Sequence, residues 1–380
     1  MSNEADKKEN LVESALRPKL AIVCRDIGVP SETFIRKHID ELYPGSTVTV
    51  CQTVQNGWST AVPCLVLGPI TPAEALNEPI MKRAEIFLKE HGVSTLMVEY
   101  LDLSVQWLEL AKRMGLRIFP HAHGYDVFTR LKEKGWAQRY LRLNDSDGVI
   151  VVSNHSKERL LELGLDQEKL HVVPCCVDIP SGPMQRKNKN VVRCLAVGRM
   201  VRKKGPLLLL ESFRKASMVN PRLRLDFVGA GYLSDEADRF VRKNGLTNLV
   251  TLFGAQPHDF VLRRMLEADI FLQHSLTDEL TNDQEGLPVS ILEAMAYSLP
   301  IISTRHAGIP EAVSDRETGY LVAEKDTEEM SKRILELADD QERRHKMGSA
   351  GRQYAVSRFA WNVERSRLLD IMNLSDPASL

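Results

Sequence analysis

Short apolar runs alternate with stretches of helical periodicity along almost the whole chain. Alternation of this kind is typical of parallel β-sheets that are covered by helices on both faces. Predicted helices in the first half include 31–42, 79–91 and 104–115. The predicted strands of the first half are 19–24, 47–53, 64–67, 95–99, 117–120, 148–152 and 171–174.

Strand-like patterning restarts after a break rich in proline, glycine and charge, and this restart divides the chain into two doubly wound, Rossmann-like domains. The predicted strands of the second half are 191–197, 222–228, 250–253, 270–272, 301–304 and 320–322. Ligands in such sheets bind beyond the carboxyl ends of the strands, so the cleft between the domains is the expected site. The predicted organisation is a disordered lead-in over 1–18, a first domain over 19–175, a linker over 176–190, a second domain over 191–358 and a final helix over 359–380.

Composition narrows the classes of function. The chain has 380 residues, a net charge of −1 and 27% charged residues, which gives no polybasic character to suggest nucleic acid. No apolar run is long enough to span a bilayer, and the polar start of the chain is unlike a secretory signal. Six scattered cysteines without a C-x-x-C pair indicate buried free thiols in a reducing compartment. We therefore expect a cytoplasmic protein.

The most informative segment reads Glu-Gly-Leu-Pro-Val-Ser-Ile-Leu-Glu over 285–293. Pro288 suits the first turn of a helix, which would place Glu285 on the incoming loop and Glu293 about two turns into the helix. Free N–H groups at a helix start attract phosphate, and carboxylates on either side would bind hydroxyls. Two solvated surface glutamates are the alternative, but a buried Glu293 among small apolar residues would need a partner. The pattern predicts a nucleotide-sugar site that includes Gly286 and Leu287.

A basic loop opens the second domain directly after its first predicted strand. Arg199 can bind two phosphate oxygens at once, and Lys204 supplies a compact second cation. We predict that both neutralise a leaving diphosphate, whereas Arg202 and Lys203 are expected to be solvated.

Two glycine segments follow later strands of the second domain. Gly229 and Gly231 resemble part of a dinucleotide fingerprint, but its third glycine is missing, so hydride chemistry is not supported. These glycines fit a turn and a donor contact equally well. The segment 307–311 follows the predicted strand 301–304 and is expected to place a further cluster of backbone N–H groups, and Glu311, near the same cleft.

The first domain carries histidines after its fifth predicted strand. His121 and His123 would point to opposite faces of an extended segment, and no third ligand is evident, so we expect no metal. His123, beside Gly124, is predicted to face the cleft. The candidates on the acceptor side are Arg25, Ser31, Glu32 and Asp126.

Together these motifs resemble the retaining glycosyltransferases of sequence family four, which have the GT-B fold. The match rests on Gly198-Arg199 with Lys204-Gly205, on the pair Glu285 and Glu293, on Gly-Ile-Pro-Glu over 308–311 and on His-Gly-Tyr-Asp over 123–126. The segments 31–35 and 121–124 resemble the branch that builds bacterial exopolysaccharide such as colanic acid. One departure is Asp26-Ile27-Gly28, where many relatives have a Gly-Gly turn.

The resemblance implies transfer of a sugar from a UDP- or GDP-sugar to a hydroxyl acceptor, with retention and without a metal or cofactor. His123, Glu285, Arg199 and Lys204 would form the reaction centre, Glu293 would bind the ribose, and Pro288 would line the donor site. Gly308 and Ile309 would offer backbone contacts to the donor. It also implies that the final helix crosses back to the first domain, starting near residue 359.

Partners and rival functions remain open at this stage. A lipid-linked oligosaccharide is a plausible acceptor, and the basic, aromatic segment 130–139 suits either a membrane surface or a solvated helix. A nucleotide-sugar epimerase on the same fold and a non-catalytic binding subunit are the alternatives.

Overall fold

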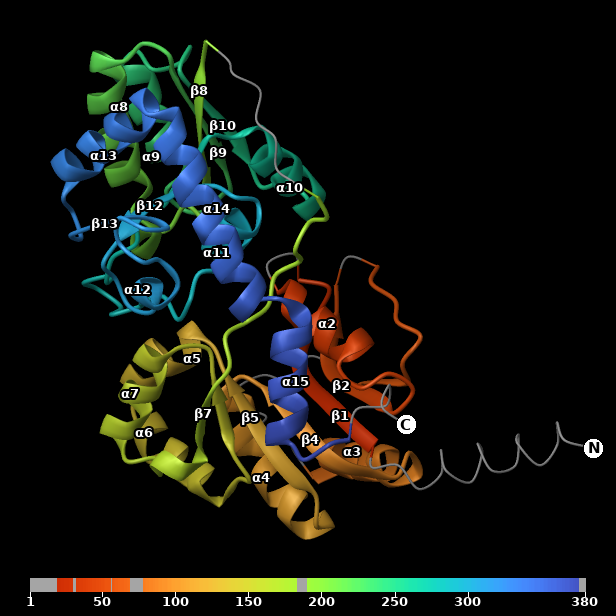
Figure 1. Ribbon diagram of the computed structural model, residues 1–380. Coiled ribbons are helices and arrows are strands. Elements are labelled where there is room, and N and C mark those ends of the chain that lie inside the picture. The colour runs from red at the N-terminus through yellow and green to blue at the C-terminus, as the bar shows by residue number, and fades with distance from the viewer. Residues whose placement is uncertain (1–18, 30–31, 56, 69–77, 183–189, 376–380) are drawn as a thin grey trace, which may run out of the picture.

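The computed structural model describes residues 19–29, 32–55, 57–68, 78–182 and 190–375. The predicted lead-in over 1–18 and the acceptor candidate Ser31 lie outside the described residues. Figure 1 shows two α/β units one above the other, with the chain passing between them twice.

The first unit contains a parallel sheet in the order β3-β2-β1-β4-β5-β6-β7. Its strands are β1 (Lys19–Ile27), β2 (Thr47–Val54), β3 (Cys64–Val66), β4 (Val93–Glu99), β5 (Arg117–Ala122), β6 (Val149–Val151) and β7 (Leu170–Val172). Its helices are α2 (Thr33–Glu41), α3 (Glu78–Glu90), α4 (Leu101–Met114), α5 (Gly124–Phe128), α6 (Trp136–Tyr140) and α7 (Asn154–Leu163), with short 3₁₀ turns at Arg130–Lys132, Leu141–Asp145 and Gln167–Lys169.

The second unit contains a parallel sheet in the order β10-β9-β8-β11-β12-β13. Its strands are β8 (Val192–Val197), β9 (Leu223–Val228), β10 (Val250–Gly254), β11 (Ile270–Leu272), β12 (Ile301–Thr304) and β13 (Gly319–Val322). The helices of this part of the chain are α8 (Pro206–Val219), α9 (Ser234–Lys243), α10 (His258–Glu267), α11 (Val289–Ala296), α12 (Ile309–Ala312), α13 (Thr327–Asp339), α14 (Gln341–Arg358) and α15 (Trp361–Ile371), with a 3₁₀ turn at Arg202–Lys204.

Both sheets have the doubly wound arrangement predicted from the sequence. The strand order reverses beside β1 in the first sheet and beside β8 in the second. A ligand site in such a sheet lies outside the carboxyl ends of the strands at this point. The two reversal points therefore direct attention to the loops after β1, β4, β8 and β11.

The helix that carries Glu293 begins later than predicted. Pro288 precedes α11 with φ −67° and ψ 113°. Its ring fixes φ at a value that a helix also uses, but its ψ is that of an extended residue, so the helix starts at the next residue. Glu293 is consequently the fifth residue of the helix, about one turn in rather than two. The N-terminus of α2 also differs, because Glu32 precedes it and makes no side-chain capping bond.

The final helix returns to the first unit, as predicted. Figure 1 shows α14 running along the second unit and α15 lying against β1 and α2. The backbone N–H of Val177 donates to the carbonyl of Phe359 (2.8 Å), which joins the linker to the start of this crossing. Farther along, the Arg117 guanidinium donates to the carbonyl of Met372 (2.6 Å). The crossing is thus held to the linker at its start and to the first unit at its far end.

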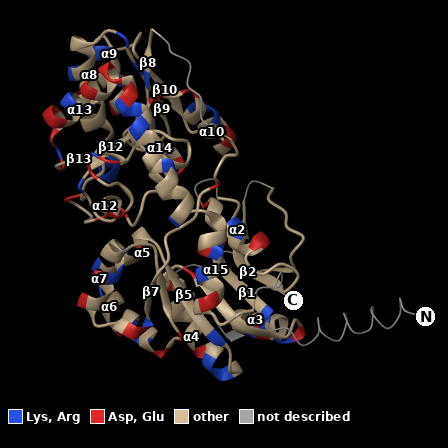
Figure 2. Ribbon diagram, in the orientation of Figure 1, with Lys and Arg blue, Asp and Glu red and all other residues tan. Residues whose placement is uncertain are grey.

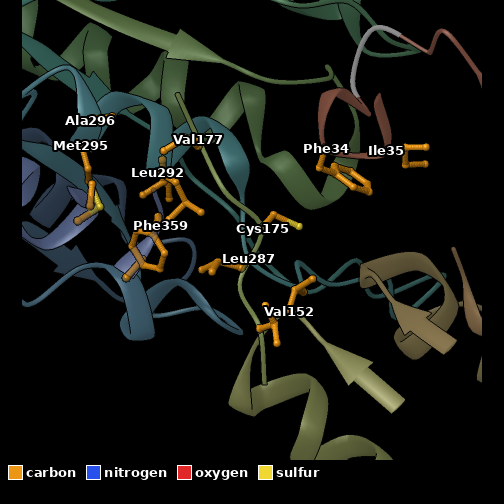
Figure 3. Close-up of a cluster of buried hydrophobic side chains, with 14 of the residues drawn as sticks. Phe34, Ile35, Val152, Cys175, Val177, Leu287, Leu292, Met295, Ala296 and Phe359 are labelled. Atoms are coloured by element: carbon orange, nitrogen blue, oxygen red, sulfur yellow. The ribbon is translucent and has the colours of Figure 1, made fainter. Parts of the chain in front are cut away.

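Buried apolar side chains continue from one unit into the other. Successive residues of β1 face opposite sides of the sheet, so Leu20 and Ile22 pack toward α2 while Ala21 and Val23 pack toward α3 and α4. The side facing α2 shares one core with the second unit. Figure 3 shows this junction with Phe34, Cys175, Val177, Leu287, Leu292 and Phe359 labelled.

Charged residues lie mainly on the outer helices, and Figure 2 shows both signs interspersed there while the strands are mostly uncharged. Among the described residues, no helix combines the length and apolar character required to cross a membrane. All six cysteines are free, as predicted, and five of them are buried; Cys64 is exposed.

Candidate active site

A cavity of about 780 Å³ lies between the carboxyl ends of the two sheets and is lined by both units. This volume is in the range of pockets that hold a small ligand. The first unit contributes Arg25, Asp26, Glu32, Phe34, Tyr100, His123 and Tyr125. The second contributes Gly198, Arg199, Lys203, Lys204, Gln256, His258, Asp283, Glu285, Gly286, Leu287, Pro288, Ser290 and Glu293.

Lys204 and Glu285 form an ion pair in this cavity. The Lys204 Nζ lies 2.9 Å from Glu285 Oε1, and the two side chains are only 13% and 8% exposed. Burial opposes ionisation of Glu285, but Lys204 and Lys203 hold the pKa of its carboxyl below the usual range. Burial also lowers the pKa of Lys204, although Glu285 beside it acts in the opposite direction. The pair brings together two residues that the sequence placed 81 positions apart on separate loops.

Lys203 contradicts the expectation that it is solvated. It is buried, and its Nζ donates to Asp283 Oδ1 (3.0 Å) and to the carbonyl of Gln284 (3.1 Å). These contacts hold the loop that carries Glu285 against the loop that carries Lys204. The sequence signal was ambiguous because neighbouring lysines in a short 3₁₀ turn point in different directions.

Arg199 lies in the cavity wall directly after β8 and is exposed. Among the described residues, no ion pair is recorded for its guanidinium, so its donors are available to a ligand. The Arg202 guanidinium carbon lies 5.7 Å from the ring centroid of Tyr232, whose side chain is exposed. Within the described part of the chain, Arg25, Lys203 and Lys204 each have an acidic partner, so Arg199 is the side chain with donors to spare for a diphosphate, as predicted for this residue type.

Glu293 has a partner that the sequence did not reveal. The His258 Nε2 lies 2.7 Å from Glu293 Oε1, and this contact raises the pKa of His258. Both residues line the cavity. His258 opens α10, and a lone histidine at a helix start gave no reason to connect it with Glu293.

The two units approach closely beside the ion pair. A Cβ atom at Gly124 of the first unit would lie 3.0 Å from the backbone nitrogen of Gly286. One at Gly308 would lie 3.0 Å from the Cβ of Ser153 in the first unit and 2.1 Å from the carbonyl oxygen of Gly286 in its own unit. Only glycine permits backbones to meet at such distances. The glycine after His123 thus gives room for the opposite unit rather than for the histidine ring alone.

Glu311 joins the units across the same boundary. Its carboxylate accepts hydrogen bonds from the backbone N–H of Asn154 (2.7 Å), the Asn154 amide (2.9 Å) and the backbone N–H of His155 (2.9 Å). These groups form the N-terminus of α7, where a negative charge is favourable. Glu311, which is predicted to lie near the cleft, therefore caps a helix of the opposite unit.

His123 lies at the floor of the cavity, but His121 does not point away from it as expected. The rings of His121 and His123 are 4.5 Å apart, and both contact Glu99 Oε2, His123 Nε2 at 2.9 Å and His121 Nδ1 at 3.0 Å. The expectation was wrong because side chains two residues apart on an extended segment lie on the same face, as Leu20 and Ile22 do on β1. Burial lowers the pKa of His123 to about 4.

A cluster of three residues that could bind a metal ion is present here, although the sequence showed no third ligand for the histidines. Ligand atoms of His38, Glu99 and His121 lie within 4.8 Å of one another. However, both ring nitrogens of His38 already contact carboxylates, so hydrogen bonding accounts for its position. We assign no metal to this cluster.

The acceptor-side candidates divide into two groups. Arg25 and Glu32 line the cavity; Arg25 pairs with the buried Asp102, and Glu32 accepts a hydrogen bond from the Tyr100 hydroxyl (2.7 Å). Burial raises the pKa of Glu32. Asp126 is fully buried instead and accepts the backbone N–H groups of His123 and Leu101 (both 2.9 Å). It orients the His123 backbone from beneath the site.

Four predicted donor contacts do not line the cavity: Gly229, Gly231, Gly308 and Ile309. Gly229 has φ +140°, and a Cβ there would lie 1.9 Å from the carbonyl oxygen of Gly198. Gly231 similarly lies against Met200. These glycines allow the loop after β9 to support the loop of Arg199, and their donor contacts stay predictions.

The histidine that supports Glu285 was also missed. His306 lies within hydrogen-bond distance of the Glu285 backbone nitrogen (3.3 Å) and, on its other side, of Glu324 (2.7 Å). Its position directly after β12 would have been the one available signal, because that edge of the sheet faces the cleft.

Comparison with known protein families places two adjacent matches on this chain. The family described as Glycosyltransferase Family 4 matches residues 63–180, and the family described as Glycosyl transferases group 1 matches residues 183–354. The second match contains the Arg199, Lys204, Glu285 and Glu293 positions.

Individual relatives agree with these matches. The chain is 26% identical over 292 residues to the amylovoran biosynthesis glycosyltransferase AmsK of Erwinia amylovora, covering 76% of this chain and 70% of AmsK. It is 29% identical over 255 residues to the putative colanic acid biosynthesis glycosyltransferase WcaL of Escherichia coli K12, covering 66% of this chain and 61% of WcaL. Among solved structures, Anabaena Alr3699/HepE in complex with UDP superimposes with a TM-score of 0.78 at 16% identity, over 93% of this chain and 99% of that one.

Proposed function

This chain belongs to the glycosyltransferases of family 4 and group 1, and we propose that it transfers a sugar from a nucleoside diphosphate-sugar to a hydroxyl acceptor with retention of the anomeric configuration. The observation that carries the proposal is the buried Lys204–Glu285 pair with Arg199 in a cavity that also contains His123 of the opposite unit.

The charges of the cavity suit a diphosphate flanked by hydroxyl groups. Lys204 has three donor hydrogens, so it can retain Glu285 and still bind phosphate oxygen, and Arg199 adds a bidentate donor. Glu285 would accept a hydroxyl of the transferred sugar through its second oxygen. Glu293, which also lines the cavity, would accept a ribose hydroxyl while His258 holds its first oxygen.

The chemical step needs no protein base in this scheme. The acceptor oxygen forms the new bond to the anomeric carbon on the same face from which the phosphate oxygen departs. The acceptor's proton passes to that phosphate oxygen, so charge and atoms balance. Arg199 and Lys204 stabilise the negative charge that develops on the leaving diphosphate.

Two features support a polysaccharide or glycoconjugate product. The relatives AmsK and WcaL are named for amylovoran and colanic acid biosynthesis. The first-unit side of the cavity presents Arg25, Glu32 and Tyr125, which are polar and aromatic groups suited to a sugar-containing acceptor.

The experiment is a transfer assay with UDP- and GDP-sugars and exopolysaccharide-type glycan acceptors, analysed by mass spectrometry. We expect one donor to give a product heavier by one sugar, and we expect Glu285→Gln to lose about 100-fold or more in turnover while the protein stays folded. An Asp370→Asn variant, on the exposed face of α15, is the matched control and should keep full activity. Conversion of the donor to an epimer in the absence of any acceptor would refute transfer.

A further inference from the structure

A continuous line of buried side chains runs from the crossing helix α15 to the floor of the cavity. Glu364 of α15 contacts His38 Nε2 (3.2 Å), and His38 Nδ1 contacts Glu99 Oε1 (2.7 Å). The second oxygen of Glu99 contacts His123 Nε2 (2.9 Å). The second oxygen of Glu364 accepts the backbone N–H of Cys176 (2.8 Å), in the linker. The line therefore connects the cavity to both segments that join the two units.

The partners determine where the hydrogens lie. An ionised carboxylate only accepts hydrogen bonds, so each histidine nitrogen that faces one must carry a hydrogen. His38 lies between two carboxylates and is therefore an imidazolium. His123 must carry its hydrogen on Nε2, which leaves Nδ1 with a lone pair.

Electrostatics support this assignment. Burial opposes protonation of His38, but Glu99 and Glu364 raise its pKa to about 10. Burial likewise opposes ionisation of Glu99, but His121 and His38 hold the pKa of its carboxyl well below the usual range. The titratable and charged groups that face His123 are Glu99 and Tyr100 at the end of β4, His121 of β5, His38 of α2, Asp126 of α5 and, across the cavity, Lys204 and Glu285.

The ring of His123 is also fixed by packing. It lies against the rings of Phe34 (4.6 Å) and Tyr100 (4.8 Å), and only a tenth of its side chain is exposed. Rotation about its side-chain bonds would break the Glu99 contact and open a gap between these rings. Packing and hydrogen bonding therefore select the same orientation.

Stability alone does not explain such a network. Replacing buried ion pairs with apolar residues of similar volume is often neutral or stabilising, so buried charges are weak evidence for a structural role. This network ends at the residue that faces the proposed reaction centre. A protonated ring there would oppose the positive charge that develops on the sugar in an oxocarbenium-like transition state.

We propose that Glu99, His38 and Glu364 are positioning residues that hold His123 as a neutral ring with its hydrogen on Nε2, and that this arrangement depends on the docking of α15. This inference rests on the proposed function for its kinetic consequence, although the state of the His123 ring can be measured without any substrate. Glu364 lines no part of the cavity, so it acts on the reaction only through the network.

The kinetic test compares Glu364→Gln with Asp370→Asn, an acid-to-amide change on the exposed side of the same helix. Glutamine keeps the shape but removes the charge that stabilises the His38 imidazolium. We expect kcat to fall about 10- to 100-fold with the KM for donor within about twofold, because the reacting geometry is perturbed while the donor groups remain. We also expect the acidic limb of the pH profile to move to higher pH, since Glu99 without a cation draws a proton onto His123.

The direct test is nitrogen NMR of histidine-labelled wild-type protein, with His123 assigned through a His123→Gln variant. We expect His123 to show one protonated and one unprotonated ring nitrogen from about pH 5.5 to 8, with the hydrogen on Nε2. A doubly protonated ring, or a hydrogen on Nδ1, at pH 7 would overturn the inference even if Glu364→Gln fails to fold. Kinetics of Glu364→Gln that match Asp370→Asn would also overturn it, whereas an inactive wild type would count against the proposed function alone.

Discussion

Replacement of Lys204 with methionine provides a quantitative test of the buried ion pair. Methionine keeps most of the apolar stem but removes the ammonium that lies 2.9 Å from Glu285 Oε1. Glu285 is 8% exposed, so its charge would remain buried. Lys203 also acts on this carboxyl, but it is already paired with Asp283. Breaking a buried pair by removing one partner costs about 3–5 kcal/mol. For a domain of about 150–250 residues this corresponds to a Tm lower by roughly 6–20 °C.

A double-mutant cycle separates the stranded charge from the lost packing. We expect Lys204→Met/Glu285→Leu to recover most of the lost stability, and we expect Lys243→Met, at an exposed position of α9, to change Tm little. The penalty in Lys204→Met should shrink as the pH falls toward 5, because the stranded carboxyl has a raised pKa and protonation removes its charge. Additive effects of the two substitutions in thermal unfolding would refute the reasoning.

Three further predictions concern other parts of the account. Glu311→Gln should weaken the cap on α7 by about 1 kcal/mol and raise the donor KM roughly fivefold, because this contact joins the two units beside the cavity. The distribution of distances between spin labels on the two units should become wider, and a distribution as narrow as that of an exposed Glu317→Gln control would contradict the prediction. Since the folded pKa of His38 is about 10, above its ordinary value of 6.5, its contribution to stability should be full below pH 6.5 and disappear as the pH rises toward 10. Urea unfolding should therefore show a steeper loss over that range in the wild type than in His38→Gln, and parallel curves would count against it. Transfer activity should survive EDTA, and a strict requirement for a divalent cation would reopen a metal role for the histidine cluster.

The strands were predictable because buried parallel strands are continuous apolar runs. The strands 270–272 and 301–304 have the predicted bounds, and both lie in the interior of the second sheet. Predicted helix boundaries were wrong where a residue suits two backbone conformations equally well. Pro288 has a backbone suited to the approach to a helix as well as to its first turn, and the extended form is the one adopted.

Side-chain pairing across long separations was not predictable. His38 contacts Glu99 and Glu364, which are 61 and 326 positions away, and no periodicity connects such residues. Lys203 and Lys204 are adjacent, yet each pairs with a different acid on the same distant loop. The glycines near the site show the same limit, because a sequence reveals that glycine is present but not which backbone approaches it. The residue types thus indicated which side chains could bind phosphate or sugar, whereas the fold determined which side chains pair with one another.

The central claim is transfer of a sugar with retained configuration, and one measurement tests it most directly. A donor sugar labelled with carbon-13 at its anomeric carbon is supplied with the acceptor, and the one-bond carbon–hydrogen coupling of the product is read by NMR. The account predicts that the label appears in the product with the anomeric configuration of the donor, and that Glu285→Gln gives almost none of it. A product with the inverted configuration, or label found only in free sugar, would contradict the account.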